Sequence, residues 1–395
     1  MDTALRVSVN TPINGGEWPV PIPNDLLLER LRVELLNYNI EYVWLDVLCL
    51  RQEGRPEMED VRMKEWEVDV PTIGSLYGQN SINGIIVTYF SGLGKPFRIG
   101  DLKNERHWLN RAWTFQESKP TTIIAGITDK SPFPPKYDGP WRLPDSTSDV
   151  KSFYSSLGLA CVSSFGPRSI YAALESMRQR SAVHVVDKIA GLGYPLISAT
   201  LPAYIRNNEP TVGENAWTRL IETMNASYRG DLFFLYPSPG NKPHMWRPSW
   251  EQVADCLPGV NGVHLVAEVD LDERHNTYQY KGHDVAGCVV KGLSRESQDG
   301  HCRHGKVTIS HNGADHSFAI VAHHQHPIPE GRYSLLGNAT GREGSDAPLT
   351  YWAVGHMQAD GRSFEKVSVV RIESAKDRAQ MKTLKLITQK SVTLL

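Results

Sequence analysis

The sequence predicts an N-terminal α/β domain, a helical middle segment and a C-terminal all-β domain. Before about residue 130, apolar runs of strand length alternate with helical patterns, as in an open α/β sheet. After about residue 260, short β-rich runs recur between turn residues, which is typical of a β sandwich or barrel. Five prolines between Pro132 and Pro144 indicate a linker. We therefore expect three parts, 1–130, 131–250 and 251–395, with 131–250 holding the Pro-rich linker and the helices.

The N-terminal part contains three candidate strands between helices. The run from Tyr42 to Leu50 is almost continuously apolar, which indicates a strand buried on both faces, as in a parallel sheet. The other strands are expected at Ile82–Phe90 and Thr121–Ile127, and the region 51–69 is expected to be a charged loop or the start of a helix. Leucines at helical spacing predict a helix over 25–37, capped by Asn24 or Asp25. Further helices are expected at Pro71–Tyr77 and His107–Glu117.

The middle and C-terminal parts differ in their patterns. Helices are expected at Ser169–Gln179 and Glu214–Ala226. The β-rich runs are Val263–Val269, Tyr278–Lys281, Val285–Val290, Lys306–Ser310, Ser317–Ala322, Tyr333–Leu336, Tyr351–Val354, Lys366–Ile372 and Leu384–Leu395.

Composition excludes several classes of protein. The formal net charge is -2, so the chain as a whole lacks the basic field of a nucleic-acid-binding protein. No apolar run reaches the roughly 18 to 20 residues that cross a bilayer, and the N-terminus has no signal-peptide pattern. The five cysteines are widely spaced without a C-x-x-C pair, which favours a reducing compartment. We expect a cytoplasmic protein that binds neither nucleic acid nor membrane.

Three segments, in order, carry a family pattern. Tyr42–Cys49 reads YVWLDVLC and is followed by Gln52, Trp66–Tyr77 forms a helix-like segment, and Arg111–Glu117 reads RAWTFQE. Together they resemble the fungal heterokaryon-incompatibility (HET) family, with its Y-L-W-I-D-x-x-C-I-x-Q, W-x(n)-I-Y and R-x-W-T-L-Q-E patterns. The resemblance implies a role in fungal non-self recognition and programmed cell death. It also implies partners, namely further copies of the chain or other incompatibility proteins.

The resemblance also implies a fold and an activity. HET domains are similar to TIR domains, which have a flavodoxin-like α/β sheet. The TIR helix pattern W-C-x-x-E has the same spacing as Trp113 to Glu117, and in catalytic TIR domains that glutamate serves NAD hydrolysis. Glu117 is thus the implied catalytic residue of an NAD glycohydrolase, with NAD as substrate and no cofactor.

The chemistry of this reaction needs few groups. Nicotinamide leaves NAD as a neutral molecule from an oxocarbenium-like ribose, so no general acid is required, unlike in ordinary glycoside hydrolysis. One carboxylate can stabilise the developing positive charge. Asp46 is a possible second acidic group, because such sheets bind ligands at the carboxyl ends of their strands. Ser91 and Gly92 follow the second expected strand, where a nucleotide can approach the backbone, and Trp113 can hold its ring.

Structural roles compete with each of these assignments. Trp113 suits a hydrophobic core, Glu117 can cap a helix or pair with Arg111, and Asp46 can make a structural hydrogen bond. Cys49 is expected to be a small buried side chain. HET domains also begin with an S-Y-x-W-G segment, and residues 1–18 contain none. A non-enzymatic module that works by assembly, or an inactive and N-terminally truncated relative, is therefore the alternative to an enzyme.

Histidines concentrate in one part of the C-terminal region. Seven lie between His301 and His326, with Cys302 among them. Their spacing matches no established zinc pattern, and alternation along exposed strands produces the same cluster. We therefore predict no metal site.

Overall fold

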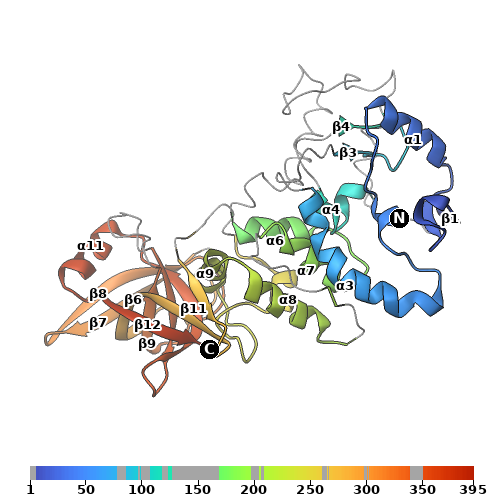
Figure 1. Cartoon of the computed structure of the whole chain (residues 1–395). Coiled ribbons are helices and arrows are strands. Elements are labelled where there is room, and N and C mark those ends of the chain that lie inside the picture. Colours follow the sequence, from blue (N-terminus) through green and yellow to red (C-terminus); the bar gives the residue numbers. More distant parts are fainter. Residues whose placement is uncertain are drawn as a thin grey trace. The chain divides into compact units, whose positions relative to one another are not determined.

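The chain forms two compact units. The computed structural model describes residues 6–77, 86–96, 98, 107–117, 123–126, 169–196, 204–205, 209–259, 265, 267–297, 300, 302–338 and 350–395. The first unit comprises Met1–Pro167 and Glu175–Thr223, and the second comprises Arg168–Leu174 and Met224–Leu395. Figure 1 colours the helices of the first unit from blue to green and the strands of the second mainly orange and red.

The first unit is mainly helical. Its helices are α1 (Leu28–Asn37), α2 (Asp46–Cys49), α3 (Glu59–Leu76), α4 (Thr114–Glu117), α7 (Val185–Gly193) and α8 (Val212–Thr223), with 3-10 turns at Pro12–Asn14, Pro56–Met58 and Trp108–Asn110. Its strands are β1 (Arg6–Val9), β2 (Val20–Pro23), β3 (Val87–Thr88) and β4 (Ile123–Ile124). β1 and β2 form an antiparallel pair, and β3 and β4 a parallel pair. Helix α6 (Ile170–Arg178) has residues in both units.

Helix α1 packs its leucine stripe inward. Leu31 and Leu35 are buried with Val20 and Ile22 of β2. From the same helix, Glu34 accepts a 2.8 Å hydrogen bond from the Tyr89 hydroxyl. Its other carboxylate oxygen accepts a 2.9 Å bond from the backbone N–H of Gly126. The carboxylate of Glu34 thus connects α1 to the chain just after β3 and just after β4.

Helix α3 contains a proline in its interior. Pro71 has no N–H, so it leaves the carbonyl of Glu67 without its helical donor. The backbone N–H of Tyr204 donates to that carbonyl at 3.1 Å instead. Tyr204 is buried against Val70 and Ile73 of α3 and Val186 of α7. The proline therefore creates an attachment point for a distant segment of the chain.

The second unit is built on one sheet of eight strands. They are β5 (Val269–Asp272), β6 (Thr277–Lys291), β7 (Arg303–His311), β8 (Ala314–Ala322), β9 (Gly331–Gly337), β10 (Tyr351–Met357), β11 (Ser363–Arg371) and β12 (Thr388–Leu394). The order is β10-β9-β6-β12-β11-β8-β7, with β5 against β6 and further pairings of β10 with β11 and β6 with β7. All pairs are antiparallel except β11–β12. Helices α9 (Ala226–Leu235), α10 (Trp250–Asp255) and α11 (Ala375–Thr383) belong to the same unit, and α9 packs against β5 and β10.

The predicted fold class is wrong. In the described chain, the N-terminal half consists of helices with two small two-stranded sheets, not a TIR-like, flavodoxin-like α/β sheet. The C-terminal half is a large, mostly antiparallel sheet that shares its unit with three helices, so it is not a separate all-β domain. The described helices of the expected middle segment form no separate part, because α7 and α8 belong to the first unit and α9 and α10 to the second.

The first motif is the main source of the error. Tyr42–Leu50 forms no strand: residues 42–45 make no ladder and α2 follows. Tyr42 is 91% exposed and Val43 54% exposed, so the run is not buried on both faces. The side chain of Asp46 accepts the backbone N–H of Val47 at 2.8 Å and sits in the first turn of a helix. An apolar run of this length does not by itself distinguish a strand from other structures. Cys49 is exposed, not buried.

Several other boundaries differ from the prediction. Helix α1 starts at Leu28, without a side-chain cap from Asn24 or Asp25. The expected helix at Pro71–Tyr77 is the end of α3, which begins at Glu59. The expected helix His107–Glu117 is divided into a 3-10 turn and α4. Parts of the two other expected strands, Ile82–Phe90 and Thr121–Ile127, lie outside the described residues. The ranges concerned, with adjoining positions, are 78–85, 118–122 and 127.

Candidate functional site

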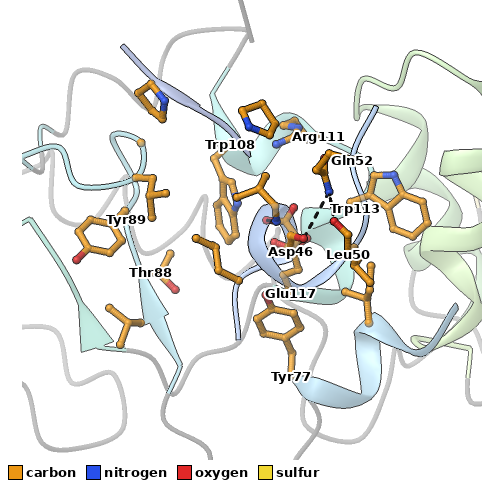
Figure 2. Close-up of a pocket in the computed structure, with 18 of the residues that line it drawn as sticks. Asp46, Leu50, Gln52, Tyr77, Thr88, Tyr89, Trp108, Arg111, Trp113 and Glu117 are labelled. Atoms are coloured by element: carbon orange, nitrogen blue, oxygen red, sulfur yellow. Dashed lines mark hydrogen bonds between the residues drawn. The ribbon is translucent and has the colours of Figure 1, made fainter. Parts of the chain in front are cut away.

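One cavity of the first unit contains residues from all three motif segments. Its volume is about 340 Å³, which lies in the range of small-molecule sites. Figure 2 shows Asp46 and Glu117 near its centre, with Arg111, Trp108 and Tyr77 around them. Its lining is Arg6, Pro21, Pro23, Leu45, Asp46, Val47, Leu50, Gln52, Trp66, Val70, Ile73, Tyr77, Ile86, Val87, Thr88, Tyr89, Gly92, Leu93, Trp108, Arg111, Trp113 and Glu117.

The short helix α2 brings Asp46 to this cavity. The indole N–H of Trp18 donates to the carbonyl of Val47 at 3.1 Å, which attaches the turn to the chain before β2. On the other side of the turn, the amide of Gln52 donates to the carbonyl of Leu50 at 2.8 Å (Figure 2). Asp46 itself is exposed. The first motif thus builds a turn that presents a carboxylate, and its exposed start contributes no core.

The second half of the site is fixed by a buried arginine. Arg180 donates to the carbonyl of Arg111 at 3.1 Å and to the hydroxyl of Thr114 at 2.8 Å. It also donates to the carbonyl of Leu109, and its guanidinium lies 5.1 Å from the ring of Phe115. These bonds hold the turn between the 3-10 helix and α4. They therefore fix the position of α4, which carries Glu117 at its end.

The environment of Glu117 changes its acidity. Burial and the nearby charge of Asp46 raise the pKa of Glu117 to about 7. Attraction to Arg111 and Arg180 and a hydrogen bond with the Trp108 side chain act in the opposite direction and are outweighed. A carboxyl group with a pKa near neutrality exists in both protonation states at physiological pH. This is the property expected of a group that takes part in chemistry.

Two arginines lie close together at the same cavity. Burial is the main cause that lowers the pKa of Arg6, the charge of Arg111 lowers it further, and the charge of Asp46 acts against them. Both arginines line the cavity that contains Asp46 and Glu117. Guanidinium pairs of this kind bind phosphate or carboxylate oxygens. In the same cavity, the charge of Asp46 acts on Arg6 and the charge of Arg111 acts on Glu117.

Aromatic rings form much of the remaining wall. Tyr77 points its hydroxyl toward Glu117 (Figure 2), and burial, with Glu117 and Asp46 nearby, raises the pKa of Tyr77. The ring of Trp113 lies 5.8 Å from the ring of Tyr204 and is tilted to it. Trp108 hydrogen-bonds Glu117 and lines the cavity. Such walls suit a flat ring.

The structure brings four of the five sequence-predicted site residues together. Asp46, Gly92, Trp113 and Glu117 all line the cavity. Ser91 is not part of the lining, and its hydroxyl accepts the backbone N–H of Arg98 at 2.8 Å.

Sequence reasoning did not single out Arg6, Tyr77, Trp108 or Arg180. Tyr77 ends the second motif segment and Trp108 lies just before the third, so a closer weighting of aromatic residues near the motifs could have found them. Arg6 and Arg180 lie 111 and 63 residues from Glu117, far outside any motif, and no local pattern indicates them.

The comparisons with known proteins found nothing similar. No model of a protein family, no curated protein and no solved structure matches the chain.

No helix of the described chain combines the length and the apolar character of a bilayer span. Within the described residues, no three histidine, cysteine or acidic side chains are arranged to hold a metal ion.

Proposed function

We propose that this protein cleaves the bond between nicotinamide and ribose in NAD, with Glu117 as the catalytic carboxylate. The observation that carries the proposal is the cavity in which Glu117 and Asp46 face Arg6 and Arg111 among aromatic rings. We place the activity in the cytoplasm of a fungal cell, in non-self recognition and programmed cell death, as the HET-like motifs suggest. The proposal depends on the residues of the cavity and needs no flavodoxin-like sheet.

Each part of NAD has a matching feature in the cavity. The nicotinamide ring is flat and cationic, so it suits the aromatic walls formed by Tyr77, Trp108 and Trp113. The diphosphate is anionic and suits the paired guanidiniums of Arg6 and Arg111. The ribose between them would then lie near the two carboxyl groups.

The proposed reaction is a simple displacement at ribose. The bond from C1′ to the nicotinamide nitrogen breaks, and its electron pair stays on the ring, which leaves neutral. The carboxylate of Glu117 stabilises the positive charge that develops on the ribose. Water then adds to C1′, its proton passes to Glu117 or to solvent, and the products are nicotinamide, ADP-ribose and one proton.

The pKa of Glu117 gives the reaction a pH dependence. Only the carboxylate form can stabilise the cation or accept a proton from water. Because this pKa is about 7, the rate should rise between pH 6 and pH 8 with a midpoint near 7. Asp46→Asn removes a charge that raises this pKa, so the midpoint should move to lower pH.

The test is nicotinamide release from NAD by the purified full chain, measured at low and at high protein concentration. Glu117→Gln should lower the rate by at least about 100-fold, because it removes the charge that stabilises the transition state. Glu29→Gln is the matched control, since Glu29 is an exposed glutamate on α1 outside the cavity. Equal release by the parent chain and Glu117→Gln at both concentrations would disprove the proposal.

A non-enzymatic function by self-assembly is the second candidate. It is favoured by the exposure of Tyr42 and Val43 at the start of the first motif, where two apolar side chains face solvent. Expression of Glu117→Gln in fungal cells separates the two. Loss of cell death supports catalysis, whereas cell death that persists in this variant supports assembly.

A further inference from the structure

Three neighbouring strands of the second unit deliver a cysteine, a histidine and a glutamate to one place. Cys302 directly precedes β7, and His323 directly follows β8. The two strands pair from Arg303 with Ala322, so both residues lie at the open end of this hairpin. β11 pairs with β8 through Arg371 and Val321, and Glu373 follows β11 by two residues. The register of the sheet therefore places the three side chains together.

The three side chains form a hydrogen-bonded chain. The Sγ atom of Cys302 lies 3.0 Å from Nδ1 of His323. On the other side of the ring, Nε2 of His323 lies 2.7 Å from Oε1 of Glu373. Because the cysteine and the glutamate contact opposite nitrogens of one imidazole, they cannot converge on a single metal ion.

The hydrogen bonds determine where the proton of the imidazole lies. An ionised glutamate can only accept, so in its shorter contact, 2.7 Å to Glu373, the Nε2 atom of His323 carries the hydrogen. The Nη1 atom of Arg371 lies 3.2 Å from the same Nε2 and donates to the carboxylate of Glu373 instead. The hydrogen bond to His323 is the main cause that lowers the pKa of Glu373, and the charge of Arg371, whose Nη1 is 3.2 Å from Oε1, also contributes. Nδ1 is then free to accept the proton of the thiol.

We propose that Cys302, activated by His323 and oriented by Glu373, is a nucleophilic thiol that forms mixed disulfides with low-molecular-weight disulfides. A thiol paired with a histidine and a third orienting group is the arrangement that activates cysteine nucleophiles. Cys302 is exposed, so a small disulfide in solvent can reach it.

The step is balanced without a further reactant. His323 takes the proton of the Cys302 thiol, and the thiolate attacks one sulfur of the incoming disulfide. The disulfide bond breaks, and its second sulfur leaves as a thiolate that takes up the proton. One thiol and one disulfide are consumed, and one mixed disulfide and one small thiol are formed.

The chain contains its own reference thiols. Cys49 and Cys256 are also exposed. Cys256 contacts a backbone carbonyl, that of Leu257, at 3.7 Å. The proposal therefore makes a prediction within a single molecule: Cys302 should react faster than these two cysteines under identical conditions.

The experiment uses the full chain and glutathione disulfide at pH 7. The mixed disulfide at each cysteine is followed over time by mass spectrometry of peptides. We expect Cys302 to react at least about tenfold faster than Cys49 and Cys256, and His323→Asn to remove this difference without changing the other two. His316→Asn is the control, because His316 pairs with Ile309 toward the turn end of the same hairpin.

Two further readouts keep the interpretation clear. Glu373→Gln should slow Cys302 less than His323→Asn does, because it leaves the base in place. Thermal unfolding of each variant should match that of the parent. Cys302 reacting no faster than Cys49 and Cys256 in the parent chain would overturn the proposal whatever the variants do. An unchanged Cys302 rate in a folded His323→Asn variant would also overturn it.

Discussion

Two glutamates, one in each unit, show how the same side chain acquires opposite properties. Glu117 of the first unit is partly buried beside another carboxylate, and its pKa is raised to about 7. Glu373 of the second unit is 44% exposed beside a histidine and an arginine, and its pKa is lowered. Glu117 is thus adapted to change protonation state, whereas Glu373 is adapted to remain ionised and orient its neighbour.

This difference indicates how each site is built. The site at Glu117 depends on a buried framework, in which Arg180 binds three acceptors around the turn before α4. The site at Glu373 depends on strand register and on exposed hydrogen bonds. Substitutions in the framework around Glu117 should therefore lower the free energy of unfolding strongly, and substitutions at Glu373 and its hydrogen-bond partners should lower it weakly.

The largest effect is expected for Arg180→Ala. It removes the donor of the Leu109 carbonyl and the Thr114 hydroxyl in a buried place and one of two donors of the Arg111 carbonyl, which should lower the free energy of unfolding by ~3 kcal/mol. Urea unfolding followed by tryptophan fluorescence measures this. The control is Arg178→Ala, because Arg178 lies on the preceding helix with its side chain 38% exposed and should change stability by less than ~0.5 kcal/mol. Equal effects of the two substitutions would contradict the buried framework.

An effect of similar size, but of opposite sign and confined to high pH, is expected for Glu117→Gln. Folding raises the pKa of Glu117 from 4.5 to about 7, so the folded chain binds this proton more tightly. The stabilisation that the proton provides is complete below pH 4.5 and is lost as the pH rises through 7. The permanently neutral variant should therefore be more stable than the parent at pH 8, by up to ~3 kcal/mol, and similar at pH 4. Urea unfolding curves between pH 4 and pH 8 measure the difference in the free energy of unfolding between variant and parent. A difference that grows toward low pH would contradict the raised pKa of Glu117.

The smallest effect is expected for Glu373→Gln. Its hydrogen bond and ion pair are exposed, so the free energy of unfolding should change by no more than ~0.5 kcal/mol between pH 6 and pH 8. Because the pKa of Glu373 is lowered on folding, this small contribution is present above pH 4.5 and is lost as the pH falls further. Urea unfolding at pH 7 and pH 4 tests it. A loss as large as that in Arg180→Ala would mean that Glu373 is part of the framework.

The strands of the second unit and two of the helices were predictable. The expected runs Lys306–Ser310, Ser317–Ala322 and Tyr333–Leu336 lie within β7, β8 and β9. Helices α6 and α8 lie close to the expected ranges, because their apolar residues recur at helical spacing. The prediction of a buried strand at Tyr42–Leu50 was wrong, because the apolar content of a segment does not show which other parts of the chain pack against it. Here Tyr42 is 91% exposed, and a short helix begins at Asp46. The sequence also did not predict that α3 continues through Pro71, because the carbonyl that Pro71 leaves without a helical donor is bonded by the distant backbone N–H of Tyr204.

The candidate site was predictable in part for a different reason. Asp46, Trp113 and Glu117 stand in short motifs, so their types and spacing were visible without a fold. Arg6 and Arg180 reach the same region from other parts of the chain. Their contribution depends on tertiary contacts, which a single sequence does not encode in any local pattern.

The proline of α3 has a consequence for measurement. The backbone N–H of Tyr204 fills the acceptor that Pro71 leaves open, and the ring of Tyr204 lies beside Trp66 and Trp113, which line the cavity. Exchange of this single amide hydrogen with solvent therefore reports whether the wall of the cavity is closed. A ligand that tightens the cavity should slow that exchange, which would allow binding to be followed even in a variant that cannot turn the ligand over.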